Sequence, residues 1–140
     1  MVSIDDAWSK YQLAEQALKS YDYANCLFNS QASIELSIKS LLDGLRIKYE
    51  MEHDVSDRLD EVPKKIKLEE YEIPDLSKLK AYSKLWVGVR NLAEYGDQRL
   101  NIAARSIFSE HEAKLALDHC STTYHKCNHW LNKPRLFDTT

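Results

Sequence analysis

Apolar residues recur at three- and four-residue steps through most of this chain, and this helical spacing constrains its fold more than any other feature. The longest stripe lies within residues 23–48 and contains Ala24, Leu27, Phe28, Ile34, Ile38, Leu41, Leu42 and Leu45. Only three glycines and three prolines occur in 140 residues, and good helix formers supply much of the rest. The sequence therefore predicts an all-α fold in a single domain covering residues 1–140.

The predicted architecture is an up-and-down bundle of four longer helices and one short helix. The longer helices are expected over about 4–20, 23–48, 75–95 and from Ser109 to Pro134. A short helix is expected to begin near His53 or Asp54 and to end at Pro63, and residues 63–73 are interpreted mainly as a connector.

Capping residues support these boundaries. Ser3 and Asp22 precede the first two helices, and Ser109 with Glu112 has the spacing of a capping box. Gly96 is placed to end the helix over 75–95 in a left-handed conformation. The inward face of that helix is expected to carry Leu79, Tyr82, Leu85, Trp86, Val89, Leu92 and Ala93, while Gly88 suggests the close approach of another helix.

Charge and cysteine content narrow the possible functions. The formal net charge of −3 gives no global attraction to nucleic acid, so any such binding must depend on a local site. Three cysteines, an odd number, argue against a disulfide framework, and we expect a reducing, cytoplasmic location. We also expect no membrane span, no signal peptide and no reading of a DNA sequence.

Several motifs, in this order, resemble those of the HEPN family (higher eukaryotes and prokaryotes nucleotide-binding). The run 32–42 carries a glutamate and a lysine four residues apart, and a His-Asp-Val start to the short helix follows it. The run 90–97 then reads Arg-Asn-Leu-Ala-Glu-Tyr-Gly-Asp, and the last helix opens with Glu-Ala and ends with Trp-Leu. The likeness extends over nearly the whole chain from Trp8 onward.

The resemblance implies a bundle that forms a homodimer, in which polar residues of the helix over 75–95 from both subunits line a cleft for nucleotide or RNA. It implies no cofactor. Many members of the family are metal-independent endoribonucleases, and others are partners of a minimal nucleotidyltransferase in toxin–antitoxin-like pairs.

The run 90–97 departs from the ribonuclease pattern of the family. Arg90 and Asn91 match that pattern, but Tyr95, Gly96 and Asp97 occupy the positions where its histidine is expected. A phenol is a poor general base near neutral pH, where an imidazole works well. The Tyr-Gly-Asp ending resembles instead a branch for which nucleotide or partner binding is proposed, and we favour binding over cleavage.

The predicted nucleotide-binding residues are Arg90, Asn91, Tyr95 and Asp97. Arg90 has the planar fork that suits a phosphate, or else it pairs with Glu94 along the helix. The side chain of Asn91 is suited to a ribose or phosphate oxygen, or else it simply lies on an outer face. Tyr95 stacks on a base or closes the end of the bundle.

Four further residues are predicted to support this site. Glu35 and Lys39 lie four apart in the order that favours an ion pair, and Glu35 is a candidate to orient Arg90. Arg99 and Arg105 follow in the connection over 97–108, where they would add positive charge beside Arg90.

Two alternatives to the binding function remain open. In the first, the protein is a metal-independent ribonuclease in which Arg90 stabilises the transition state and His53 replaces the missing imidazole. In the second, it is a non-catalytic interaction module that docks a protein partner.

No metal site is predicted. His125 and His129 are spaced like a two-histidine ligand pair with Asp118 on the same side, but that side lies opposite the buried stripe and is expected to be solvated. Cys120 and Cys127 lie seven apart on the inward face, where small apolar side chains are expected.

Overall fold

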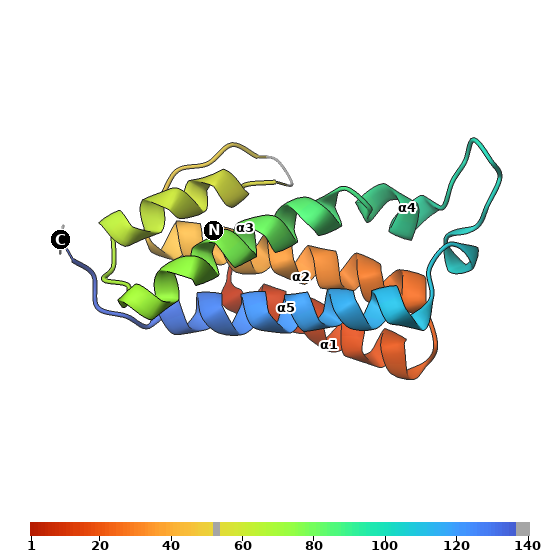
Figure 1. Cartoon of the computed structure of the whole chain (residues 1–140), viewed down its shortest axis with the longest axis horizontal. Coiled ribbons are helices and arrows are strands. Elements are labelled where there is room, and N and C mark those ends of the chain that lie inside the picture. The colour runs from red at the N-terminus through yellow and green to blue at the C-terminus, as the bar shows by residue number, and fades with distance from the viewer. Residues whose placement is uncertain (52–53, 137–140) are drawn as a thin grey trace.

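The computed structural model describes residues 1–51 and 54–136, and this part of the chain is helical (Figure 1). The α-helices are α1 (Ile4–Lys19), α2 (Tyr23–Gly44), α3 (Ile73–Val87), α4 (Arg90–Tyr95) and α5 (Glu110–Leu131). Three 3-10 helices connect them: η1 (Ser56–Lys64), η2 (Glu70–Glu72) and η3 (Ala104–Ser106). The described residues form no β-strand, and the predicted all-α bundle is confirmed.

Helix α2 is the centre of the bundle, because α1, α5, α3 and α4 all pack against it. In Figure 1 the long helices run side by side along the long axis of the molecule, and α4 lies at one end beyond α3. The face of α2 that the apolar stripe predicted is buried, including Leu27, Ile34, Ile38, Leu41 and Leu42. No helix in the described ranges is long and apolar enough to cross a membrane.

The first two helices begin where their caps predicted but end earlier than expected. The hydroxyl of Ser3 accepts a hydrogen bond from the Asp5 amide, and Asp22 caps α2. The second helix ends at Gly44 rather than near residue 48, because Arg46 takes a φ of +58° and the Ile47 amide turns back to the Leu42 carbonyl at 2.9 Å.

The prediction of one helix over 75–95 is wrong, since the chain forms α3 and α4 with a break at Gly88 and Val89. The inward face was also misassigned in part, since Leu85 and Leu92, expected inward, are 49% and 37% exposed. No other helix approaches Gly88 closely: a Cβ there would meet only carbonyl oxygens of its own helix, the nearer at 3.4 Å. The low helix propensity of glycine favours an interruption at this position.

The connector before α3 is more ordered than the sequence suggested. Its η2 turn places Glu72 at 1% exposure, where the carboxylate accepts hydrogen bonds from the Trp130 indole and the Lys133 ammonium, both at 2.8 Å. Burial alone raises the pKa of Glu72, but the bonds from Lys133, the Glu69 amide and Trp130 outweigh it and lower the pKa to about 2. This carboxylate therefore fastens the connector to the end of α5.

The last helix begins at the predicted residue without the predicted capping box. Ser109 is the N-cap of α5, but its side chain accepts no backbone hydrogen bond. Its hydroxyl instead bonds directly to the Glu112 carboxylate and does not cap a helix amide.

Candidate functional site

The candidate site lies at the end of the bundle where the chain leaves α4. Gly96 takes a positive φ of +73° there, but its ψ of −168° lies outside the left-handed helical region that the sequence predicted. A Cβ on Gly96 would overlap the Ile102 carbonyl oxygen and lie 2.7 Å from the Ala104 amide nitrogen. Asp97 and Ile102 then exchange two backbone hydrogen bonds of 2.8 and 2.9 Å. The loop is thereby folded tightly back against the end of α4.

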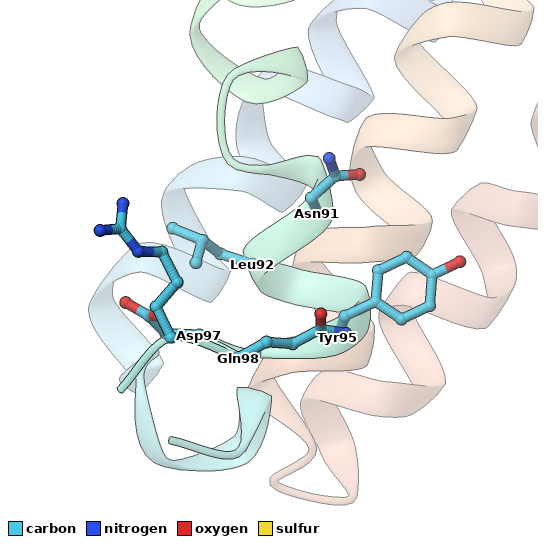
Figure 2. A pocket seen from close by; sticks show the side chains of 7 residues that line it. Asn91, Leu92, Tyr95, Asp97 and Gln98 are labelled. Carbon is cyan, nitrogen blue, oxygen red and sulfur yellow. The ribbon is translucent and has the colours of Figure 1, made fainter. Parts of the chain in front are cut away.

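Beside this fold-back, α4 and the loop line an open pocket of about 310 Å³ (Figure 2). Asn91 and Tyr95 are one helical turn apart, and Figure 2 shows their side chains on one side of α4, with Leu92 and Asp97 on the other. The lining residues are Asn91, Leu92, Tyr95, Gly96, Asp97, Gln98 and Arg99. The structure thus brings together Asn91, Tyr95, Asp97 and Arg99 of the predicted set.

The polar groups of the pocket are accessible. Asn91 is exposed, and Tyr95 is 60% exposed, so its ring does not close the end of the bundle. Asp97 is half-buried, and its Oδ1 accepts a hydrogen bond from the Leu100 amide at 3.1 Å, which shapes the loop. An exposed amide and an exposed phenol therefore lie on one side of α4, and a half-buried carboxylate and an exposed leucine side chain lie on the other.

Arg90 is the first residue of α4 and is directed toward α2 rather than into this pocket. Its guanidinium carbon lies 5.6 Å from the centre of the Phe28 ring, close enough for a cation–π contact. Within the described ranges, no carboxylate comes within 4.0 Å of Arg90, so the alternative pair with Glu94 is not formed. Among the described residues, this half-buried guanidinium is therefore not paired with a carboxylate.

The supporting residues on α2 form a polar row of their own. Lys39 is 8% exposed and bonds to the Glu35 carboxylate at 3.2 Å, as the i, i+4 spacing predicted. The side-chain amide of Gln31 donates to the same carboxylate at 3.4 Å, and its own Oε1, which is buried, has no hydrogen-bond partner within the described residues. Glu35 makes no ion pair with Arg90, so no contact here supports the orienting role.

The two other predicted residues are not part of the pocket. Arg105 lies on η3, is exposed and does not line it. His53, the candidate replacement for the missing imidazole, lies outside the described residues.

A histidine that the sequence did not single out is held between α3 and α5. The indole nitrogen of Trp86 donates to Nδ1 of His119 at 2.9 Å, and the imidazole stacks on Tyr82 with centres 3.8 Å apart. Burial lowers the pKa of His119 below 6.5, while the nearby Asp118 acts in the opposite direction. Because Nδ1 accepts, the neutral ring carries its proton on Nε2. The sequence signal was only that His119 directly precedes a residue of the buried stripe.

The groups considered for metal binding remain apart. His125, His129 and Asp118 are exposed, as the sequence predicted. Across residues 1–51 and 54–136 no cluster of three or more His, Cys, Asp or Glu residues could hold an ion. The three cysteines are buried and free, and burial raises the pKa of Cys26 to about 11 and that of Cys120 to about 12.

Comparison with known proteins gives one match. A family model described as HEPN domain matches residues 2–130, which include every helix except the last residue of α5. No curated protein and no solved structure matches the chain.

Proposed function

This chain belongs to the HEPN domain family, and on that premise we propose that it binds a nucleotide or an RNA phosphate at the α4 end of the bundle. Family membership links the chain to nucleotide- or RNA-related function. Which of its residues take part is our proposal, and it rests on the geometry around α4.

The observation that carries the proposal is the state of Arg90. A half-buried arginine in a protein usually pairs with a carboxylate, because burying a charge without a partner is costly. Arg90 has no such partner among the described residues and instead lies over the Phe28 ring, with its Cζ 5.6 Å from the ring centre. A planar, fully charged guanidinium with free N–H groups matches a phosphate group in shape and charge.

The pocket on α4, into which Arg90 does not point, offers the other contacts that a nucleotide needs, so the proposed ligand would extend from Arg90 to this pocket. Asn91 follows Arg90 directly and offers both a donor and an acceptor. The exposed ring of Tyr95 gives a base a surface to stack on, and the carboxylate of Asp97 can accept a hydrogen bond from a ribose hydroxyl. Arg99 lines the same pocket and adds positive charge.

We propose binding without efficient cleavage, because residues 95–97 offer no imidazole where the ribonuclease pattern has one. His119 is not placed to replace that imidazole, since its Nδ1 is engaged by Trp86 and its ring is stacked on Tyr82. The Tyr-Gly-Asp ending supports the same assignment to a binding branch of the family.

We also propose that the protein acts as a homodimer and in company with a nucleotidyltransferase. Large aliphatic side chains at the end of α3, in α4 and in the following loop are exposed, and a contiguous patch of such side chains is typical of an interaction surface. They are Leu85, Leu92, Leu100 and Ile102, exposed by 49%, 37%, 67% and 39%.

Calorimetric titration of ATP, and of a short single-stranded RNA, into wild type and Arg90→Ala tests the binding proposal. Arg58→Ala is the matched control, because Arg58 is an exposed arginine on η1 and is far from Arg90 in the sequence. We expect Arg90→Ala to weaken binding at least tenfold and Arg58→Ala to leave it unchanged. Cleavage of the RNA that persists with a chelator present would favour the ribonuclease, and no binding of either probe would favour the interaction module.

A further inference from the structure

The contact between Arg90 and Phe28 has a property that an ion pair lacks. A carboxylate partner would occupy the fork of N–H groups and neutralise the charge. An aromatic face attracts the cation through its π electrons while the N–H groups, which lie in the guanidinium plane, remain available. Phe28 therefore holds the guanidinium without consuming what a phosphate would bind.

Phe28 is well placed to fix the position of the Arg90 guanidinium. It lies on α2, is half-buried and packs against the hydrophobic core. Arg90 begins α4 directly after the break, and Val89 before it also packs against the core. The guanidinium is thus held between two elements whose backbones are anchored by burial.

The side chains beside Phe28 on α2 also leave the N–H groups of Arg90 available. Gln31 is three residues further along, so its Cβ lies on the same side of the helix, roughly 5–6 Å from that of Phe28. Gln31 is 3% exposed, and its amide is engaged with Glu35. Glu35, further along α2, is bonded by Gln31 and Lys39 and forms no ion pair with Arg90.

We propose that Phe28 is a positioning residue for the anion site: its ring orients the Arg90 guanidinium toward a ligand phosphate and keeps it free of a carboxylate. This role rests on the proposed function, since it presupposes that Arg90 binds an anion. From the apolar stripe alone, the Phe28 ring would have been assigned only to core packing.

Two variants of Phe28 separate orientation from packing. Phe28→Leu keeps an apolar side chain but removes the π face, and Phe28→Tyr keeps the ring. Phe108→Leu is the matched control, because Phe108 is another half-buried phenylalanine packed against the core. Urea denaturation of each variant confirms that it is folded under the binding conditions.

The first readout is the NMR shift of the Arg90 side-chain protons, assigned with Arg90→Lys. The Phe28 ring should move these protons upfield in wild type and in Phe28→Tyr, and the shift should vanish in Phe28→Leu. The second readout is the affinity for ATP and for the short RNA. We expect Phe28→Leu to weaken it about two- to fivefold, the range of a cation–π contact at a partly exposed site, with Phe28→Tyr and Phe108→Leu near wild type.

The outcomes distinguish the two proposals. If Arg90→Ala abolishes binding while Phe28→Leu binds as wild type does, the positioning role is refuted and the function stands. An unchanged upfield shift in Phe28→Leu also refutes it. If Arg90→Ala binds both probes as tightly as wild type, the proposed function fails and the positioning role fails with it.

Discussion

Replacing Gly96 with alanine should open the loop that forms the pocket while leaving the bundle folded. Gly96 has φ +73° and ψ −168°, a region that residues with a side chain almost never occupy, at a cost of about 1–3 kcal/mol. The added Cβ would also collide with backbone atoms of Ile102 and Ala104, which cannot move aside as a flexible side chain can. Relief of that collision requires separation of Asp97 from Ile102.

The size of the expected destabilisation follows from the hydrogen bonds that are lost when the loop opens. Two backbone hydrogen bonds join Asp97 and Ile102, and each contributes about 0.5–1.5 kcal/mol. Keeping the loop closed would cost the backbone strain of about 1–3 kcal/mol plus the collision, and opening it would instead cost the two hydrogen bonds, about 1–3 kcal/mol in sum. Since the loop can open without the bundle, the loss of global stability should be smaller than that sum.

Gly88→Ala is the matched control, because Gly88 has a helical φ of −66° and space for a Cβ at 3.4 Å from its nearest neighbour. It should leave the loop intact and stabilise the protein by up to about 1 kcal/mol. Amide hydrogen exchange at Asp97 and Ile102 is the assay, with urea denaturation for global stability. We expect Gly96→Ala to lose protection at both amides. Unchanged protection in that variant would refute the argument from backbone geometry.

Three further predictions concern stability and assembly. Wild type should lose about 1–3 kcal/mol of stability as pH falls from 4.5 toward 2, since the folded-state pKa of Glu72 is depressed. Urea denaturation measures this loss, which should shrink in Glu72→Gln. The loss should persist in the control Glu70→Gln, because Glu70 is exposed. Stability should also decline as pH falls below 6.5, because His119 is held neutral, and a pH titration of unfolding in His119→Gln should lack that component. If the exposed leucines form a homodimer interface, Leu92→Glu should halve the mass measured by light scattering; a monomeric wild type would contradict that interface.

Local signals predicted the bundle well because they act within one helix. The stripe on α2 and the caps Ser3 and Asp22 depend on residues three or four apart, and the structure contains all of them. The break near Gly88 was missed because the apolar spacing continues through it, so periodicity alone could not separate α3 from α4. A glycine inside a helical pattern was the available signal, and it was interpreted as close packing.

The candidate site was predictable by residue but not by contact. The run 90–97 identified Asn91, Tyr95 and Asp97, which the structure brings to one pocket. The partners across elements were not predictable, because they join positions far apart in the chain. Arg90 meets Phe28 across 62 positions (90 − 28), and Trp86 meets His119 across 33. Such pairs depend on how helices are placed, which no local pattern encodes.

The break between α3 and α4 gives these distant pairs a common cause. In one continuous helix Arg90 would follow Trp86 by four residues and lie on the same face, beside α5, where Trp86 meets His119. The observed chain instead ends α3 at Val87 and starts α4 at Arg90, so that Trp86 contacts α5 while Arg90 contacts α2. The interruption that sequence periodicity failed to predict thus lies directly before the charge on which the proposed site depends.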